Sequence, residues 1–364
     1  MTMSSHEAML MLEDGTLFTG EAFGAIGEAF GEAVFDTGMG AYQEMLTDPA
    51  HHRQIVVATA PHTGNTGWND EDSQNLARRV FAAGYVVRDL SPRPSNWRSQ
   101  RSLDDVMAQQ GIVGMHGVDT RALTHHLRTH GTMRAGISSL DQAPHELLVK
   151  VKASPSLDGL DLAAEVTTSE GYSLAPTAVQ RFTVVAIDLG ITLGVINEMA
   201  ARGMTVTVLP ASASIEDVRA VNPDGVCLAG GPGDPAALDT TLAADLLADG
   251  LPILGIGLGC QVLARAVGLT TRRLPVGHHG VNLPVRRASD GKIMITAHNH
   301  CFTIEAPSDT VVEVTHVAVN DGAVEGFRTP GALGVQFNPA FGPHDTAQVF
   351  DDFAAMMVKE APNA

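Results

Sequence analysis

The sequence predicts an α/β protein of two domains, and three observations support this fold class. The chain has 364 residues, 44% of them hydrophobic, which is enough for about two domains. The first half has short alternating hydrophobic segments separated by turn residues, whereas the second half alternates strand and helix patterns. Between them, residues 167–181 lose this periodicity. We therefore expect domains at 1–166 and 182–364, joined by a linker at 167–181.

In the first half, an apolar run that ends at Leu12 and a second run that starts at Leu17 flank Asp14-Gly15, which predicts a β-hairpin. Residues 120–130 carry leucines one helical turn apart, after Asp119, a good helix cap, and are expected to form a helix. Further strands are expected at 54–60 and 84–87. This pattern predicts a mixed α/β domain.

The second half predicts a mainly parallel sheet. Strands are expected at 183–187, 205–209 and 225–228, and helices at 192–202, at 214–221 and after Pro235. Strands that alternate with helices at this spacing imply right-handed βαβ units, with helices on both faces of the sheet. The segment 251–268, LPILGIGLGCQVLARAVG, continues the pattern with an apolar strand, a glycine-rich turn and a helix.

The glycine-rich turn GIGLG at 255–259 has two interpretations. A dinucleotide site would need the spacing GxGxxG, but Cys260 follows directly, and the acidic residue expected at the end of the next strand is missing. The alternative is a sharp strand-to-helix elbow, which needs small flanking residues so that the backbones can approach closely. Because such an elbow normally displays a nucleophile at its tip, we expect a catalytic-type site here.

Composition excludes several classes of function. A formal charge of −18 disfavours binding to nucleic acid or to anionic membranes, so small-molecule or protein partners are expected. The N-terminal stretch has acidic residues and lacks a basic start and a sustained apolar run, which predicts a cytoplasmic protein without a membrane span. Cys227, Cys260 and Cys301 form no CxxC pair, so reduced thiols are expected.

Several motifs of the second half resemble a known family. The segment PILGIGLGCQVLARAVG resembles the nucleophile elbow of class I glutamine amidotransferases, G-[IV]-C-[LF]-G-x-Q, and LAGGPGDP at 228–235 resembles their oxyanion loop. Three later motifs resemble the subgroup that serves carbamoyl-phosphate synthetase: VGHHGVNLPV at 276–285, ITAHNHCF at 295–302 and GVQFNPAFGPHD at 334–345. The resemblance implies a Rossmann-like amidotransferase domain in the second half.

The first half resembles the small-subunit domain of the same synthetases. The motifs are LEDGTLFTGEAFG at 12–24, FDTGMGAYQEMLTDP at 35–49, APHTGNTGWNDED at 60–72, PSNWRS at 94–99 and GVDTRALTHHLR at 117–128. The resemblance therefore covers nearly the whole chain. It implies an N-terminal α/β domain that contacts a large synthetase subunit.

The residues at the family's catalytic positions do not fit glutamine hydrolysis. That reaction needs a thiolate, a base, a carboxylate that orients the base, and backbone donors for the oxyanion. Gly257 stands where the family places its cysteine, Asn338 where it places the histidine, and Ala340 at the carboxylate position. Because triad members act as a unit, losing one costs roughly 10⁴- to 10⁶-fold in turnover. Glutaminase activity is therefore expected to be undetectable.

The family's glutamine pocket is altered in part. Ala50 replaces a glutamine-binding serine, and Cys301 replaces the glycine of the family's NHGF motif. The pocket elements that survive are Gly231, Gly233, Leu258, Gln261, Asn299 and Phe302. These residues are expected to be either an inherited scaffold or an anion-accepting pocket at a helix N-terminus.

Two further groups of residues suggest other sites. Cys260 lies one helical turn beyond Gly257, and with His300 or His298 it would make a relocated Cys/His couple, although buried cysteines usually behave as small hydrophobes. The histidines at 278, 279, 298 and 300 suggest a metal, but GHHG resembles the ordinary family motif and neither HH nor HNH has the spacing of a standard zinc site. No metal site is expected.

The resemblance gives three hypotheses for function. The first is a non-hydrolysing small subunit that scaffolds or regulates a large synthetase subunit using free ammonia. The second is a paralogue repurposed as a binding or assembly protein of a specialised pathway, and the third is an enzyme rewired around Cys260. The sequence has no GxxxxGK[ST] phosphate loop, so no cofactor is expected in this chain, and ATP and magnesium are expected on the large-subunit partner.

Overall fold

The structure is a computed structural model that describes residues 6–306, 312–342 and 344–358. The first five residues and Pro343 of the motif at 334–345 lie outside the described residues. The chain divides into two compact units. The first comprises residues up to Asp158 together with Pro275–His279, and the second comprises Gly159–Leu274 and the residues from Gly280 onward.

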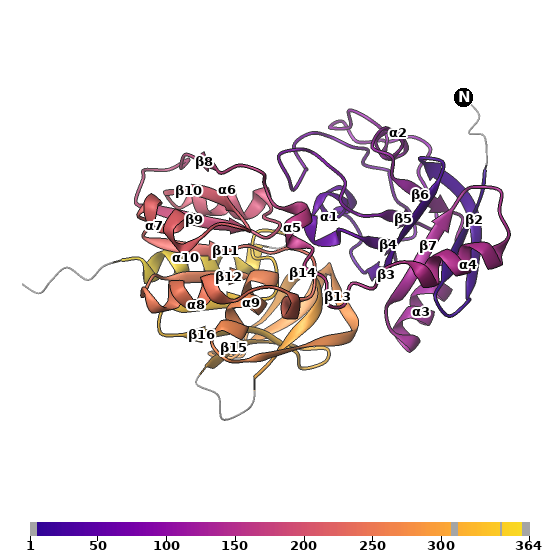
Figure 1. Cartoon of the computed structure of the whole chain (residues 1–364). Helices are drawn as coiled ribbons and strands as arrows, with labels where there is room; N and C mark the ends of the chain where they lie inside the picture. The colour runs from indigo at the N-terminus through magenta and orange to yellow at the C-terminus, as the bar shows by residue number, and fades with distance from the viewer. Residues whose placement is uncertain (1–5, 307–311, 343, 359–364) are drawn as a thin grey trace, which may run out of the picture. The chain divides into compact units, whose positions relative to one another are not determined.

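The first unit is built around a closed β-barrel, drawn in indigo to magenta in Figure 1. Its strands neighbour one another in the order β1-β2-β6-β5-β4-β3-β7. Their bounds are β1 (Glu7–Leu12), β2 (Leu17–Gly24), β3 (Glu28–Asp36), β4 (Gln54–Ala58), β5 (Gly84–Val86), β6 (Val113–His116) and β7 (Met133–Ser138). The helices are α1 (Tyr42–Thr47), η1 (Pro49–His51), α2 (Leu103–Gln109), α3 (Thr120–His130) and α4 (Pro144–Ala153). The predicted mixed α/β domain is confirmed.

The hairpin and the helix predicted for this unit are present, and the strands expected at 54–60 and 84–87 are present but end at Ala58 and Val86. β1 and β2 form the predicted antiparallel hairpin, with Leu10 opposite Phe18. Helix α3 begins and ends at the predicted residues. At its start, the carboxylate of Asp119 accepts the Ala122 N–H at 3.0 Å and caps the first turn. Leu123 and Leu127 of this helix are fully buried in the barrel core.

The second unit contains a sheet of ten described strands in the order β14-β13-β15-β16-β17-β12-β11-β9-β10-β8. Their bounds are β8 (Tyr172–Leu174), β9 (Phe182–Asp188), β10 (Met204–Pro210), β11 (Gly225–Leu228), β12 (Ile253–Ile256), β13 (Thr270–Arg287), β14 (Ile293–Glu305), β15 (Glu313–Ala318), β16 (Val324–Thr329) and β17 (Ala332–Val335). Strands β10, β9, β11, β12 and β17 pair in parallel. The parallel arrangement of the first four was predicted, whereas β17 was not. The antiparallel strands on either side of them were not predicted.

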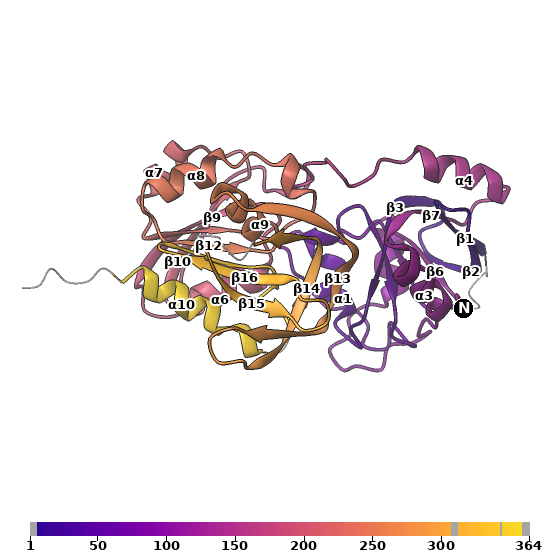
Figure 2. The same cartoon turned by 90° about the horizontal axis from the view of Figure 1, so that it is seen from below.

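Helices cover both faces of the parallel strands. They are α6 (Leu193–Ala201), α7 (Ile215–Val221), α8 (Thr241–Ala248), α9 (Leu258–Ala266) and α10 (Gln348–Met356), with the short helices α5 (Ala163–Val166), η2 (Pro235–Ala237) and η3 (His344–Thr346). Side chains of α6 and α10 pack in one hydrophobic cluster and those of α7, α8 and α9 in another. Val184 and Val185 of β9 point into different clusters, as the alternation of a strand requires. Figure 2 shows α6 and α10 on the opposite side of the sheet from α7 and α8.

The predicted linker at 167–181 differs from the structure. Residues 172–174 form β8, which pairs antiparallel with β10 through Leu174 opposite Val206. The second unit begins at Gly159, before the expected boundary at 166, because α5 packs with this unit through Ala163. A strand of three partly exposed residues at a sheet edge leaves too short a pattern to be recognised in the sequence.

Candidate functional site

The predicted strand-to-helix elbow is present between β12 and α9. β12 ends at Ile256, α9 begins at Leu258, and Gly257 between them has φ 54° and ψ −119°, in the range that favours glycine. A Cβ at Gly255 would lie 2.8 Å from the Cα of Cys260, and one at Gly259 would lie 2.1 Å from the carbonyl oxygen of Leu228. The flanking glycines are therefore required by close backbone contacts, which explains the GIGLG turn.

The elbow has room for a side chain at its tip but carries none. A Cβ built on Gly257 would lie 3.4 Å from the Cα of Gly230 and 3.9 Å from the carbonyl oxygen of Gln336, both ordinary contact distances. The position is half-buried. The fold thus keeps the geometry that presents a nucleophile, while residue 257 offers no nucleophilic atom.

The positions of the base and the carboxylate follow the neighbouring parallel strand. β17 pairs with β12 through Val335 opposite Ile256, and the Gly257 N–H donates to the Val335 carbonyl at 2.9 Å. Asn338 comes three residues after β17, so it lies at the carboxyl edge of the sheet with Gly257, where ligands bind in open α/β folds.

The side chains of Asn338 and Ala340 make structural contacts within the second unit. The Asn338 side-chain oxygen accepts the Ala340 N–H at 3.0 Å, and its Nδ2 donates to Thr192 Oγ1 at 3.5 Å. The methyl group of Ala340 packs against the cluster that contains α6 and α10. A neutral amide and a methyl group can neither accept a proton from a nucleophile near pH 7 nor orient a base.

The oxyanion-type loop after β11 keeps its glycines for steric reasons. A Cβ at Gly231 would lie 1.8 Å from the carbonyl oxygen of Leu189. Gly233 has φ 111°, and a Cβ there would lie 2.9 Å from the carbonyl oxygen of Leu160. Both positions therefore exclude larger residues by backbone packing alone, and their survival does not require a bound ligand.

β14 forms a further wall of the site. The Asn338 N–H donates to the Ala297 carbonyl at 2.8 Å, which pairs the residues after β17 with β14. Asn299 of this strand is half-buried, and the side chains of Cys301 and Phe302 are buried. The structure thus brings the predicted residues 299, 301 and 302 to the strand that pairs with Asn338.

Gln261 and Ala50 have local structural contacts. The buried Gln261 Nε2 donates to the Phe302 carbonyl and to Gln336 Oε1, both at 2.8 Å, so this side chain links α9 to the sheet. Ala50 lies in η1 of the first unit, where its N–H donates to Asp48 Oδ1 at 2.9 Å. Leu258, in the first turn of α9, is buried in the hydrophobic core.

Cys260 has the environment of a core thiol. It is fully buried, and burial together with the nearby Glu325 carboxylate raises the pKa of this thiol well above its usual range. The reactive form of cysteine is the thiolate, which this environment disfavours. The geometry gives no support to a catalytic couple of Cys260 with His300.

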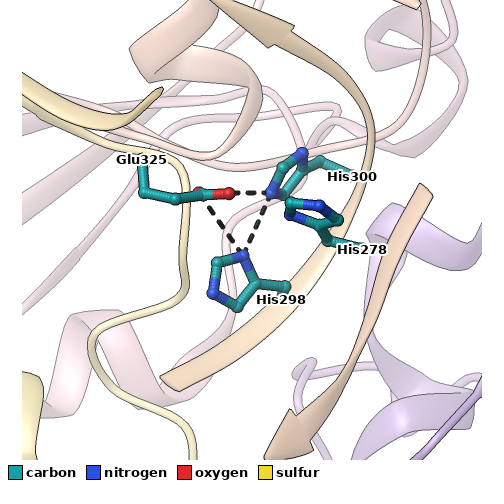
Figure 3. A group of neighbouring side chains, drawn as sticks. All are labelled: His278, His298, His300 and Glu325. Atoms are coloured by element: carbon teal, nitrogen blue, oxygen red, sulfur yellow. Dashed lines mark hydrogen bonds and ion pairs between the residues drawn. The ribbon is translucent and has the colours of Figure 1, made fainter. Parts of the chain in front are cut away.

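One residue of the site, Glu325, was not indicated by the sequence, although His298 and His300 were both considered as candidates. The side chains of His298 and His300 on β14 and Glu325 on β16 converge in the interior of the second unit, as Figure 3 shows. We call these three residues the His/Glu cluster. Figure 3 also draws His278, which belongs to the stretch 275–279 of the first unit. The alternation of His298 and His300 along a strand was a usable signal, because it places both side chains on one face.

Comparison with known proteins identifies the family. Residues 10–137 match the carbamoyl-phosphate synthase small chain CPSase domain, and residues 185–356 match glutamine amidotransferase class I. The chain is 51% identical to the carbamoyl phosphate synthase small chain of Streptomyces avermitilis over 96% of both chains. It is 48% identical to that of Mycobacterium tuberculosis over 97% of this chain and 99% of the relative. The chain belongs to the carbamoyl phosphate synthase small-chain family.

Both units of this small chain have a counterpart in the family domains. The CPSase-domain match falls within the barrel unit, and the amidotransferase match contains the elbow as well as Asn338 and Ala340. The altered positions therefore lie inside the matched amidotransferase domain. Among the helices of the described residues, none has both the length and the apolar character needed to cross a membrane.

Proposed function

We propose that this small chain does not hydrolyse glutamine and instead scaffolds or regulates a large synthetase chain that uses free ammonia. The observation that supports this proposal is the elbow, which keeps a backbone geometry suited to a nucleophile while Gly257 stands at its tip. The residues at the positions of the base and the carboxylate are an amide and a methyl group with structural contacts.

The expected loss of activity is large. Nucleophile, base and orienting carboxylate act as a unit, so removing one already costs roughly 10⁴- to 10⁶-fold in turnover. With all three replaced, only binding and backbone donors remain to promote hydrolysis. Cys260 does not compensate, because it is fully buried and its pKa is raised.

The partner follows from the family. A small chain implies a large synthetase chain, and the ATP and magnesium of the reaction belong to that partner. The sequence matches relatives named as small chains over nearly their full length, which supports a retained assembly role. A cytoplasmic location of the complex is part of this proposal.

The test is reconstitution with the large chain. The two chains are co-expressed and co-purified, and carbamoyl phosphate formation is measured with saturating ammonium or with glutamine as the only nitrogen source. We expect a stable complex that makes carbamoyl phosphate from ammonium and not from glutamine. Synthesis from glutamine at a rate comparable to that from ammonium would refute the proposal, and so would failure of the two chains to associate.

A further inference from the structure

The His/Glu cluster joins two strands in the interior of the second unit. His298 and His300 are two residues apart on β14, so both side chains lie on the same face, and Glu325 is on β16, which pairs with β14 through Val324 opposite Ile304. The side chains of His298 and Glu325 are 0% exposed and that of His300 is 4% exposed. A carboxylate buried this completely needs compensation by positive charge.

Hydrogen bonds fix the orientation of both imidazole rings. Thr296 Oγ1 donates its only proton to the Leu283 carbonyl at 2.8 Å, so His298 Nε2, 2.5 Å from the same oxygen, must be the donor of that contact. His300 Nδ1 lies 2.8 Å from the Phe302 carbonyl, which can only accept. In the neutral rings, the lone pairs therefore sit on His298 Nδ1 and His300 Nε2.

These two lone pairs and the carboxylate converge on one point. His298 Nδ1 lies 3.1 Å from His300 Nε2, and Glu325 Oε2 lies 3.5 Å from the first nitrogen and 3.4 Å from the second (Figure 3). Three electron-rich atoms at such distances repel one another unless a cation lies among them. That cation is either a proton, held by one ring or by the carboxyl group, or a metal ion.

The distances favour a metal ion. Metal–ligand bonds of about 2.0–2.1 Å in a tetrahedron separate neighbouring ligand atoms by about 3.3–3.4 Å, close to all three observed separations. A proton on one ring would account for the contact of 3.1 Å between the nitrogens. It would leave Glu325 Oε2 at 3.4–3.5 Å from the two ring nitrogens, beyond the distance of about 2.7–2.9 Å typical of a charge-assisted hydrogen bond.

The contacts beyond the cluster have the pattern found around metal-binding histidines. Such histidines usually donate their other ring N–H to a carbonyl, a carboxylate or another acceptor, which fixes the tautomer. His300 does this through the Phe302 carbonyl, which also accepts from Gln261, and His298 does so through Thr296. Two imidazoles and one carboxylate suit divalent first-row transition metals.

We propose that His298, His300 and Glu325 bind one divalent transition-metal ion, with zinc as the probe. The ion would link β14 to β16, next to Ala297, which pairs with Asn338. This proposal departs from the expectation that the chain binds no metal, and the reason is Glu325, which supplies the negative ligand that the histidines lacked. It does not depend on whether the small chain hydrolyses glutamine.

The test uses the full-length chain, freed of metal with a chelator and titrated with Zn²⁺ by calorimetry. We expect one tightly bound zinc per chain, and an affinity weaker by about 100-fold or more in Glu325→Gln and in His298→Gln. His62→Gln is the matched control, because His62 pairs with Asp89 on the surface. The zinc affinity of this variant should equal that of the wild type. Absence of zinc binding by the wild type, or unchanged affinity in both cluster variants, overturns the proposal in favour of a shared proton.

A second measurement on the wild type stands even where a variant fails to fold. X-ray absorption at the zinc edge should show only nitrogen and oxygen neighbours, at about 2.0–2.2 Å. A sulfur neighbour at about 2.3 Å would place the ion on a cysteine and would overturn the assignment.

Discussion

Replacing Gly257 with cysteine tests both the geometry of the elbow and the absence of the other catalytic groups. The new Cβ would meet its nearest atoms at 3.4 and 3.9 Å, so no clash is expected. The cost comes from the backbone, because a residue other than glycine at φ 54° and ψ −119° is strained by about 1–3 kcal/mol. We expect Gly257→Cys to fold, with an unfolding free energy lower by this amount in urea titration.

The restored thiol should not restore activity. A half-buried cysteine without a base is a few per cent thiolate at pH 7, and Asn338 and Ala340 supply neither a base nor its carboxylate. We therefore expect ammonia release from glutamine by Gly257→Cys to remain at least about 10⁴-fold below that of a relative with an intact triad. Alkylation by iodoacetamide should nevertheless label the new thiol at position 257 in the folded variant, which would show that it is accessible at the elbow tip.

The matched control is Gly259→Ala, two residues further on. Its Cβ would lie 2.1 Å from the Leu228 carbonyl oxygen and 2.6 Å from that of Ala229, and backbone atoms cannot rotate away. We expect the unfolding free energy of Gly259→Ala to fall by more than about 3 kcal/mol, at the upper end of overpacking costs. Glutamine hydrolysis by Gly257→Cys near the rate of a triad-bearing relative, or a smaller loss for Gly259→Ala than for Gly257→Cys, would refute the reasoning.

Three further predictions concern titration, reactivity and packing. Burial raises the pKa of Asp36 to about 6, above its ordinary 3.8, so the native state holds this proton more tightly than the unfolded chain and loses stability as pH rises from about 4 to 6. Asp36→Asn should remove that loss, so above pH 6 its free energy of unfolding should be higher than that of the wild type by up to about 3 kcal/mol. Urea titrations at several pH values measure this difference, and equal pH profiles of the two proteins would contradict the prediction. Cys260 should react with a thiol reagent only after unfolding, because it is fully buried and its pKa is raised. Rapid labelling of Cys260 in the native protein, located by mass spectrometry, would show that this thiol is not in the core. Leu127→Ala should lower the unfolding free energy of the first unit by about 2–5 kcal/mol, because Leu127 is fully buried. Replacement of the exposed Arg128 by Ala should change it by less than about 0.5 kcal/mol. Similar losses for the two variants would show that α3 is packed differently.

Features set by local sequence were predictable. The cap at Asp119 and the spacing of Leu123 and Leu127 determine α3, and the glycines of GIGLG determine the elbow, because each acts through neighbours in the chain. The parallel strands β9 to β12 were predictable for the same reason, since each strand and helix carries its own pattern. The structure adds the physical role of each glycine, which the sequence alone does not distinguish.

Features set by distant pairing were not predictable. β8 has three residues, and its pairing with β10 is decided across more than 30 positions of the chain. Glu325 lies 25 residues after His300 in the chain, so only the folded structure shows that its carboxylate lies 3.4 Å from His300 Nε2. Alternation along β14 indicates which residues share a face, whereas the group opposite them depends on the register of the antiparallel sheet.

The source of the nitrogen in the product tests the central claim most directly. The complex of this small chain with its large chain is given ATP, bicarbonate, unlabelled ammonium and an excess of glutamine labelled with ¹⁵N in the side-chain amide. The carbamoyl phosphate formed is then analysed by mass spectrometry. Because the chain has no nucleophile at Gly257 and no base at Asn338, the product nitrogen should come entirely from ammonium. Product that carries the label of the glutamine amide would contradict the account.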